Sequence, residues 1–316
     1  MKVLDYNALG IYKKGIIKNC INYFYLILTY PLYLICTLLK SFNNKKDFKY
    51  TISLCLIFKD ESNFLREWIE YHKLIGVDHF YLYNNDSKDN YKEVLKTYIE
   101  QDIVTLIDFP GNYRQLEAYN HCYENFKDKS QWLAFIDADE FINIKNYNNI
   151  QDLLLKFKAD PTLYLQWRMF GTSGHMKENS SKLVIESYTQ CWNCLCTTGK
   201  CFINNRFKKF NIGIHRHFIK FMGIRMPGRS INRSLTYNNT ILYKNNIDKE
   251  GYLNHYWSKS LEFYKYKDFL KGDVASEKNI KIKAMENRFK NHELNNKVKD
   301  FSIQRWIIFL KENLLS

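Results

Sequence analysis

The sequence lacks the glycine-rich motifs that hold phosphates in many nucleotide-binding proteins. Neither G-x-G-x-x-G nor G-x-x-x-x-G-K-[ST] occurs in the 316 residues. Both motifs work by letting backbone N–H groups approach phosphate oxygens closely. A glycine-cradled dinucleotide and a P-loop nucleotide are therefore disfavoured.

Motifs for nucleic-acid binding are also missing. The chain has no zinc finger, no arginine-rich stripe and no ribonucleoprotein-type aromatic motif, yet its net charge is +14. A charge of this size favours an anionic partner. We therefore rank an anionic lipid surface or phosphorylated substrates above nucleic acid, and we expect no nucleic-acid partner.

Cysteine is too sparse for a disulfide scaffold, with eight residues in the whole chain. Four of them, Cys191, Cys194, Cys196 and Cys201, form a C-x2-C-x-C-x4-C cluster. This spacing leaves a structural zinc site open, although zinc ribbons separate their pairs by a longer loop. The alternative is reduced thiols in a cytoplasmic protein.

Near the start of the chain, a run of 20 residues without formal charge extends from Cys20 to Leu39. As a helix it would cross a hydrocarbon core of ~30 Å. Lysines flank it on both sides, and no small-residue cleavage site follows it. We predict a membrane-associated segment over 1–48, either spanning or in-plane, with a soluble core helix as the alternative.

From residue 50 onward, apolar strands alternate with amphipathic helices. The expected strands are 50–58, 77–85, 102–109 and 132–136, and the expected helices are 61–76, 91–100 and 112–127. For the first helix we expect Ser62 as the cap and Gly76 as the stop. The alternation predicts an α/β domain over 49–272, with a mostly parallel central sheet flanked by helices.

Three carboxylates follow the last of these strands within four positions: Asp137, Asp139 and Glu140. Residues two apart in an extended chain point the same way, so the two aspartates would share one side of the strand end. Like charges this close are unfavourable unless a cation joins them. A divalent metal with hard oxygen ligands is one explanation. Acids that cap a following helix or lie solvated in a loop are the other.

Ligands of parallel sheets bind outside the carboxyl ends of the strands. The loops there carry Lys59, Asp60 and Glu61 after the first strand, and Asn84, Asn85 and Asp86 after the second. We expect both sets to converge with the three carboxylates. A metal held by carboxylates, itself holding a diphosphate, is then the remaining economical way to bind a nucleotide.

Four segments carry a family resemblance: "FKDESNFLREWIEYHKLIGVDHFYLYNNDSKD", "RQLEAYNHCYENF" followed by "WLAFIDADEFI", "WRMFGTSGH" and "NHYWSKSLEFYKYK". In this order, over roughly Ser53 to Gly272, they resemble nucleotide-sugar glycosyltransferases of the GT-A fold. The likeness is strongest to glycosyltransferase family 92 and its bacterial relatives. The resemblance implies a GT-A-type nucleotide-sugar-binding fold.

The resemblance also implies roles for single residues. Asp137 and Asp139 would form the D-x-D element, binding Mn²⁺ or Mg²⁺ that bridges the donor diphosphate, and His255 would complete the metal shell. A hydrogen-bonded core histidine is the alternative for His255, and His215 and His217 compete for the ligand role. Lys259 would steady the departing phosphate. The donor-binding set is Lys59, Asp60, Glu61, Asn84, Asp86 and Asp137.

Inversion at the sugar carbon requires a base that deprotonates the acceptor hydroxyl. The resemblance does not identify this base. Glu140 lies next to the D-x-D element and either acts there or orients an aspartate, while Glu178 and Glu186 lie in a loop-rich region. The segment "FGTSGH", from Phe170 to His175, either lines the sugar pocket or forms a plain turn.

The last part of the chain, 273–316, reads as a basic helical tail. Its "FSIQRWIIFLKENLL" segment predicts an amphipathic helix that packs on its own domain by default, with another chain or a membrane as alternatives.

Taken together, the sequence predicts a metal-dependent inverting glycosyltransferase. It would move a hexose from a UDP-sugar to a glycan or lipid-linked acceptor in surface-glycan biosynthesis, with its catalytic domain on the cytoplasmic side of a bacterial inner membrane. The rivals are a metal-dependent nucleotidyltransferase or phosphodiesterase, and a non-enzymatic glycan-assembly protein that retains the fold.

Overall fold

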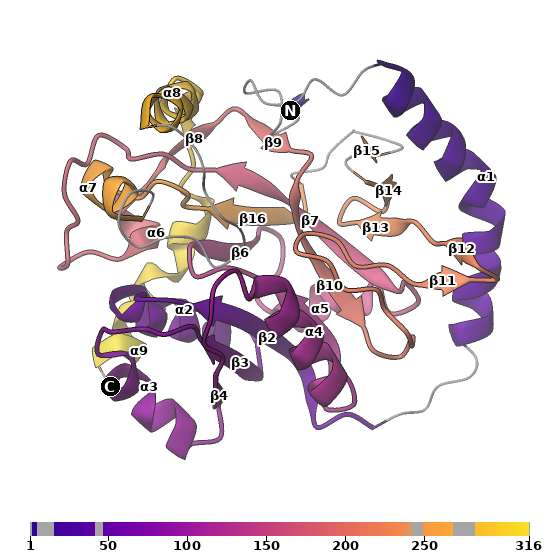
Figure 1. Ribbon diagram of the computed structural model, residues 1–316, viewed down its shortest axis with the longest axis horizontal. Helices are drawn as coiled ribbons and strands as arrows, with labels where there is room; N and C mark the ends of the chain where they lie inside the picture. Colours follow the sequence, from indigo (N-terminus) through magenta and orange to yellow (C-terminus); the bar gives the residue numbers. More distant parts are fainter. Residues whose placement is uncertain are drawn as a thin grey trace.

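The structure is a computed structural model that describes residues 2–4, 16–41, 47–238, 240–241, 249–267 and 282–315 (Figure 1). The helices are α1 (Ile16–Ser41), α2 (Ser62–Leu74), α3 (Tyr91–Glu100), α4 (Gln115–Phe126), α5 (Ile150–Leu155), α6 (Val184–Ser187), α7 (Leu261–Lys265), α8 (Ile282–Glu293), the 3-10 helix η3 (Ser302–Trp306) and α9 (Ile307–Leu315). The strands up to β9 are β1 (Lys2–Leu4), β2 (Tyr50–Phe58), β3 (His79–Asn84), β4 (Val104–Asp108), β5 (Ser130–Phe135), β6 (Glu140–Ile144), β7 (Thr162–Met169), β8 (Gln190–Trp192) and β9 (Cys194–Cys196). The later strands are β10 (Gly199–Asn204), β11 (Lys220–Phe221), β12 (Ile224–Arg225), β13 (Gly228–Ser230), β14 (Leu235–Tyr237), β15 (Thr240–Ile241), β16 (Gly251–His255) and β17 (Asn296–Lys299).

Four parallel strands form the centre of the main sheet, in the order β5-β2-β3-β4. Helices α2, α3 and α4 are the crossovers between successive strands of this set. The predicted α/β fold with a parallel centre is therefore confirmed. Because all four strands point the same way, their carboxyl ends meet at one edge, where the predicted site residues lie.

Beyond β5 the sheet continues through β10, β7, β13, β14 and β15. β10 is antiparallel to both β5 and β7, and a short branch adds β16 and β6 beside β7. We did not predict these strands. Their pairings join segments far apart in the sequence, and short strands of this kind carry little periodic signal.

Alternate residues of β2 face two separate cores. Ile52, Leu54, Leu56 and Phe58 pack in the core that contains α2, α3 and α5. Cys55 and Ile57 pack in the second core, with α4 and the inner side of α1. Helices thus cover both faces of the parallel centre, as the alternation of strands and helices predicts.

Helix α2 ends as predicted but begins differently. Gly76 follows the helix with φ of +99°, and a Cβ there would lie 2.4 Å from Asn149 Oδ1. Both facts require glycine at this position. The cap prediction was wrong, because the N-cap residue is Glu61 and the Ser62 N–H donates to Asp89 Oδ2 at 2.7 Å.

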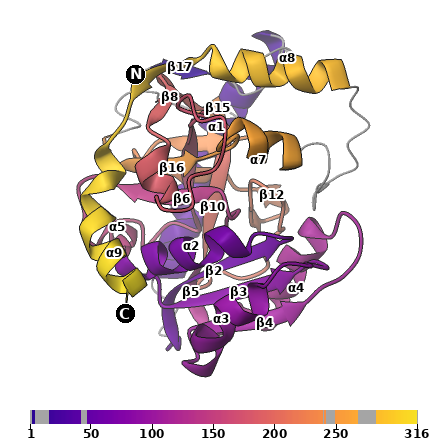
Figure 2. The same cartoon turned by 90° about the vertical axis from the view of Figure 1, so that its left-hand side faces the viewer.

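The described part of the C-terminal segment, 282–315, packs onto the same unit. Strand β17 pairs with β8, and α9 runs alongside α2 (Figure 2). Arg168 Nη1 donates to Asp300 Oδ2 at 2.9 Å, and both side chains are buried. The division into domains at 49 and 273 stays a prediction.

Helix α1 lies at the outer edge of the molecule beside β13, β14 and β15 (Figure 1). Within it, Asn19–Leu39 is long and apolar enough to cross a membrane.

Candidate active site

The three carboxylates lie in a tight turn between β5 and β6. The Glu140 N–H donates to the Asp137 carbonyl oxygen at 3.0 Å, and the Asp137 N–H donates to Glu140 Oε2 at 2.8 Å. These reciprocal bonds hold the turn in one conformation. The Asp137 side chain keeps 30% of its surface exposed, whereas those of Asp139 and Glu140 keep 7% and 0%. Asp137 is therefore the acid that faces out of the site.

Three side chains orient the Asp137 carboxylate. Gln115 Nε2 and Tyr119 OH, one turn apart on α4, donate to its Oδ1 at 2.9 and 3.0 Å. Lys200 Nζ, on β10, lies 2.9 Å from its Oδ2 and 3.9 Å from Glu140 Oε2. Lys200 is fully buried, so this ion pair is little screened by water.

Asp139 lies close to a histidine that is more than a hundred residues later in the sequence, His255. Strand β16 pairs with β6 so that His255 is opposite Glu140, and the Tyr256 N–H donates to the Asp139 carbonyl oxygen at 2.8 Å. His255 Nε2 consequently lies 3.5 Å from Asp139 Oδ1. Lys267 Nζ donates to the other oxygen, Oδ2. The pairing register of β6 and β16 thus brings Asp139 and His255 together, as predicted.

Burial and charge divide the three acids. Burial by itself would raise the pKa of Asp139, but Lys267 and His255 bring it well below its usual range. Burial likewise opposes ionisation of Asp137, and Lys200 lowers its pKa. Burial raises the pKa of Glu140 well above its usual range. The site thus holds two ionised aspartates beside an acid that favours its protonated form.

The competing histidines differ in position. His215 and His255 contact the same indole ring, that of Trp167, with centroids 5.2 and 4.5 Å away. His217 packs instead on Phe135, and its Nδ1 accepts from the Gly213 N–H at 3.3 Å. Burial, followed by Lys200, lowers the pKa of both His215 and His217 to about 3. Both are neutral imidazoles, and His215 lies nearer the carboxylates.

The loops after β2 and β3 meet at the same edge, as predicted. Asp60 Oδ1 accepts from the Lys88 N–H at 2.6 Å, and the Asp60 N–H donates to Ser87 Oγ at 3.0 Å. Asn84 Nδ2 donates to Asp108 Oδ1 at 2.8 Å. Asp86 is exposed and accepts from the Gly111 N–H at 2.9 Å. Asp60 and Asp86 both have positive φ, of 50° and 55°. Lys59 is half-buried at the end of β2.

Lys259 is placed beside Glu61 rather than at the open edge. Its Nζ lies 3.6 Å from Glu61 Oε2 and 3.2 Å from the centroid of the Phe64 ring, and its side chain is fully buried. Lys259 also contributes to the low pKa of Asp139, so it lies within the electrostatic reach of the carboxylates. The cation in contact with Asp139 is Lys267.

The two further glutamates lie apart. Glu178 Oε1 accepts from the Ser260 N–H at 3.0 Å, and both its oxygens accept from Tyr188 OH, so it adjoins the Lys259 loop. Glu186 pairs with Lys311 of α9 at 2.9 Å. In the "FGTSGH" segment, His175 Nε2 lies 3.1 Å from the Ser187 carbonyl oxygen and the His175 carbonyl accepts from the Leu261 N–H. This segment therefore supports the loop that follows His255.

Four contributors to the site were not in our predicted set: Gln115, Tyr119, Lys200 and Lys267. The first two had a signal, because residues four apart on a helix share a face and "RQLEAYNH" lies directly before the carboxylate strand. Lys200 had none, because β10 was itself not predicted. Lys267 is the last residue of the fourth resemblance segment, "NHYWSKSLEFYKYK", but nothing in that segment assigned it a role.

Among the residues that the structure describes, no three His, Cys, Asp or Glu side chains gather closely enough to form a ready-made metal site. At the carboxylates, the ammonium groups of Lys200 and Lys267 lie against Asp137 and Asp139. The cysteines of the C-x2-C-x-C-x4-C cluster form no disulfide and are buried on β8, β9 and β10.

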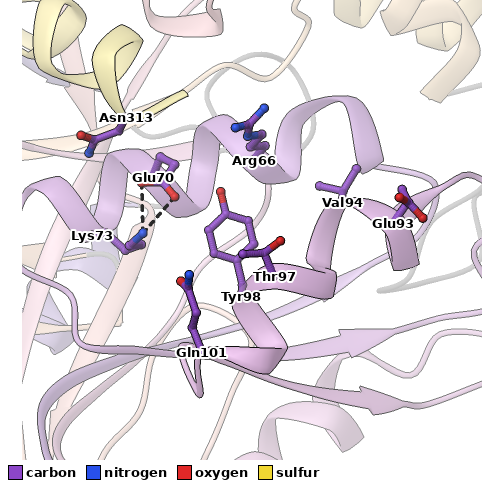
Figure 3. A pocket seen from close by; sticks show the side chains of 9 residues that line it. All are labelled: Arg66, Glu70, Lys73, Glu93, Val94, Thr97, Tyr98, Gln101 and Asn313. Atoms are coloured by element: carbon purple, nitrogen blue, oxygen red, sulfur yellow. Dashed lines mark hydrogen bonds and ion pairs between the residues drawn. The ribbon is translucent and has the colours of Figure 1, made fainter. Parts of the chain in front are cut away.

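A cavity of about 640 Å³ lies between α2, α3 and the end of α9 (Figure 3). Lys73 and Glu70 on its wall pair with each other at 2.9 Å. None of its lining residues belongs to the predicted site, so it is separate from the carboxylate edge.

A known protein family matches the part of the chain that contains this site. The sequence model of glycosyltransferase family 92 matches residues 48–302, which include every residue of the carboxylate edge. The chain belongs to glycosyltransferase family 92. The predicted family is thereby confirmed, and the match extends through β17 to the start of η3.

Curated relatives match over shorter stretches. A glycosyltransferase family 92 protein of Oryza sativa subsp. japonica is 33% identical over 132 residues, covering 40% of this chain and 23% of its own length. A family 92 protein of Arabidopsis thaliana is 28% identical over 130 residues, which cover 40% of this chain and 22% of the relative. Galactan beta-1,4-galactosyltransferase GALS2 of the same plant is 32% identical over 104 residues, which cover 30% of this chain and 20% of the relative. The chain spans about a quarter of the length of the first of these relatives.

Solved structures resemble the chain over less than half of its length. TarS 1–349 of S. aureus has 13% sequence identity and a TM-score of 0.32, covering 41% of this chain and 38% of its own. Glucosyl-3-phosphoglycerate synthase of Mycobacterium tuberculosis has 15% identity and a TM-score of 0.27, covering 38% and 44%.

Proposed function

We propose that the chain is a metal-dependent, inverting glycosyltransferase that moves a hexose from a UDP-sugar to a glycan or lipid-linked acceptor at a membrane. Membership of family 92 supports the reaction class. The finer statements rest on the site, and the observation that carries them is the pairing of Asp139 with His255 across the β6–β16 ladder.

This pairing brings an acid and an imidazole to the carboxyl end of a parallel strand. The 3.5 Å between Asp139 Oδ1 and His255 Nε2 suits two atoms that share one cation better than it suits a hydrogen bond. His255 Nδ1 is buried without a hydrogen-bond partner among the described residues. The Nε2 atom, which faces Asp139, is the one that would bind the cation.

The donor set fits Mn²⁺ or Mg²⁺, because carboxylates prefer hard divalent ions and a neutral imidazole joins them readily at Mn²⁺. Asp139 and His255 would hold the ion, and Asp137 would face it in the orientation set by Gln115, Tyr119 and Lys200. When bound, the ion neutralises charge on the departing nucleoside diphosphate.

The chain's own cations would share that task. Lys267 contacts Asp139 directly, whereas Lys259, buried beside Glu61, acts on the carboxylates through its charge. Lys267 is paired with Asp139, for which the metal would compete. Lys259 is paired with Glu61, for which the donor would compete. We propose that Lys259 stabilises the leaving diphosphate, and that Lys59, Asp60, Glu61, Asn84 and Asp86 surround the nucleoside.

Glu140 acts in this proposal through Asp137. Its side chain is fully buried and its Oε2 accepts from the Asp137 N–H, so it fixes the D-x-D turn. A group this enclosed does not meet an acceptor hydroxyl. Glu178, half-buried beside the Lys259 loop, is the better placed of the two remaining candidates for the base.

The related Arabidopsis galactosyltransferases make UDP-galactose the first donor to test. The decisive experiment scores UDP release over a panel of UDP-sugars with Mn²⁺, with and without a membrane extract as the source of acceptor. The Asp139→Asn variant serves as the control. Release of pyrophosphate or a nucleoside monophosphate would instead indicate a nucleotidyltransferase or phosphodiesterase. No transfer from any donor would indicate a non-enzymatic protein with this fold.

A second measurement tests the roles of His255 and Lys259 separately. His255→Ala should raise the Mn²⁺ concentration for half-maximal rate, because it removes one ligand and leaves both aspartates. Lys259→Ala should lower turnover by about 10²- to 10³-fold with little change in that requirement. His79→Ala, a buried histidine at the amino end of β3, is the matched control. Wild-type rate and metal dependence in both variants would contradict the assignment.

A further inference from the structure

Helix α1 presents its polar side chains to the protein. Its buried positions Asn22, Leu26, Thr29, Tyr33 and Cys36 recur at helical spacing and so form one face. Asn22 Nδ2 donates to Thr240 Oγ1 at 3.0 Å, and Tyr33 OH donates to Asp160 Oδ1 at 2.5 Å. Two of the five residues on this face are amides or hydroxyls of short side chains, and a third bonds through its phenol.

The outer face of α1 is apolar. Its exposed large side chains are Ile17, Ile21, Phe24, Ile27, Leu28, Tyr30, Leu34, Ile35, Leu38 and Leu39. Phe24, for example, keeps 63% of its surface exposed and Leu28 keeps 61%. A helix on the surface of a water-soluble protein has the opposite arrangement, with its apolar stripe turned to the core. The arrangement in α1 is stable where the surroundings of the helix are themselves apolar.

The β11–β12 hairpin lies beside α1 (Figure 1). Tyr25 OH of α1 donates to the Arg225 carbonyl oxygen of β12 at 2.7 Å, which fixes the hairpin against the helix. At the hairpin turn, Met222 is 80% exposed, and Ile224 beside it is 42% exposed. Two separate elements thus contribute large apolar side chains to one region, which we call the α1 face.

The positive charge of the chain favours an anionic lipid surface, rather than a second copy of the protein, as the partner of the α1 face. In the sequence, Lys13, Lys14 and Lys18 precede the apolar run, and Lys40, Lys45 and Lys46 follow it. Two copies joined through this face would bring two net charges of +14 together. Anionic headgroups would instead compensate them, at about 1 kcal/mol for each lysine near the surface.

The attachment of α1 along its length excludes a bilayer-crossing orientation. Polar contacts hold it at Asn22, Tyr25 and Tyr33, over about 16 Å of helix. Asp160, the partner of Tyr33, also pairs with Arg229 at 2.9 Å. If α1 crossed the membrane in this arrangement, this ion pair and the edge strands β14 and β15 would enter the hydrocarbon, where unsatisfied backbone groups are costly.

We propose that the α1 face binds the surface of an anionic bilayer, with α1 lying in the membrane plane and the hairpin tip at Met222 inserted beside it. In-plane helices of this kind bury their apolar side about 5–10 Å into the headgroup region. The inference deepens the membrane association of the proposed function, and it is independent of the reaction.

Flotation of the full-length protein with vesicles of phosphatidylcholine containing phosphatidylglycerol tests the surface. We expect binding that weakens with salt and with phosphatidylcholine alone. The double variant Phe24→Gln with Leu28→Gln should lower vesicle affinity by at least about 10-fold, because two exposed apolar side chains no longer insert. Met222→Gln should lower it by a smaller factor.

The matched control is Ile308→Gln with Phe309→Gln on α9, two side chains that are 70% and 53% exposed far from α1. This variant should bind like the wild-type protein. Equal vesicle binding by the α1 and α9 double variants would overturn the proposal. So would a protein that does not bind vesicles but forms a dimer that the α1 variant abolishes.

Depth measurements test the in-plane orientation. Cys20 is the one exposed cysteine among the described residues, so single cysteines at Ile21 and Leu38 in a Cys20→Ser background can be labelled with a fluorophore quenched by lipids of known depth. In-plane binding places both probes at similar depths in one leaflet. A crossing helix would separate them by about 26 Å, which would overturn the orientation. UDP release from a soluble acceptor analogue reports on the reaction in each variant, so a failure of either proposal is distinguishable from the other.

Discussion

The carboxylate edge and the α1 face place their polar groups for opposite reasons. At the carboxylate edge, ionised side chains are enclosed together: Lys200 with Asp137, and Lys267 and His255 with Asp139. At α1, neutral side chains turn inward and hydrogen-bond to the rest of the protein, and apolar side chains are left outside. Enclosed charges are costly unless close pairing and hydrogen bonds offset their desolvation, and a site that binds a charged ligand needs such charges. The inward polar groups of α1 need no such charges, since they only join a helix to its domain.

The largest expected effect comes from removing the acid that meets His255. Asp139→Asn should lower transfer by about 10³-fold or more, because a neutral amide compensates neither the metal nor His255. The purified variant, resupplied with Mn²⁺ after EDTA treatment, should keep its far-ultraviolet circular dichroism and its vesicle binding. Near-normal turnover would contradict the D-x-D assignment. The enclosed charges around Asp139 would then have no role in the reaction.

Next in size is the loss of the enclosed lysine. Lys200→Met leaves Asp137 and Glu140 without their cation, and breaking a buried pair in this way costs about 3–5 kcal/mol. Because Asp137 is partly exposed, we expect the lower end of this range in urea denaturation. The double variant Lys200→Met with Asp137→Asn should recover part of the loss. An equally unstable double variant would mean that Lys200 acts by packing rather than by charge.

A smaller effect, dependent on pH, is expected at Glu67. Burial raises the pKa of Glu67 to about 7, although its carboxylate accepts from the Val184 and Ile185 N–H groups. Between its ordinary value near 4.5 and about 7, the folded state therefore holds a proton that the unfolded state has released. The free energy of unfolding should fall by about 1.4 kcal/mol per pH unit as the pH rises through this window.

Denaturation of Glu67→Gln between pH 5 and pH 8 measures this contribution, which should be absent from the variant. Glu117→Gln, an exposed glutamate of α4, is the control and should keep the wild-type pH dependence. A wild-type slope in Glu67→Gln would locate the pH dependence elsewhere.

The smallest expected effect tests the attachment of α1. Tyr33→Phe removes the hydroxyl that bonds Asp160 and should destabilise the protein by about 1–2 kcal/mol, because Arg229 still partners the acid. Tyr30→Phe, on the outer side of the helix, should have no measurable effect. Thermal unfolding in the absence of vesicles compares the two. Equal melting temperatures for both variants would show that the inward bonds of α1 contribute little.

Sequence patterns were most informative where a segment is long and strongly periodic. Helix α3 has the predicted bounds, and β2, β3 and β4 match within two residues, because their periodicities and flanking polar residues are local properties. Gly76 was predicted for the same reason, since a positive φ selects glycine.

Predictions failed or were lacking where position depends on distant pairings. The register that sets His255 opposite Glu140 joins segments over a hundred residues apart, and only the family resemblance suggested it. Lys200 carries no local signal, because its role depends on β10 lying antiparallel between β5 and β7. The Ser62 cap was displaced by Asp89, a contact that the helix sequence alone does not contain.

The bond between Arg168 and Asp300 bears on the order in which the protein is made. Arg168 is on β7, directly before the residue paired with His255, and its counter-ion is synthesised 132 residues later. Until then the growing chain lacks the acid that pairs with this arginine, and burying the arginine without it is costly, which disfavours the final packing of β7 and β16. Helix α1, in contrast, is complete early in translation. A nascent chain could therefore reach a lipid surface well before it is able to transfer a sugar, so that activity would begin only at its place of use.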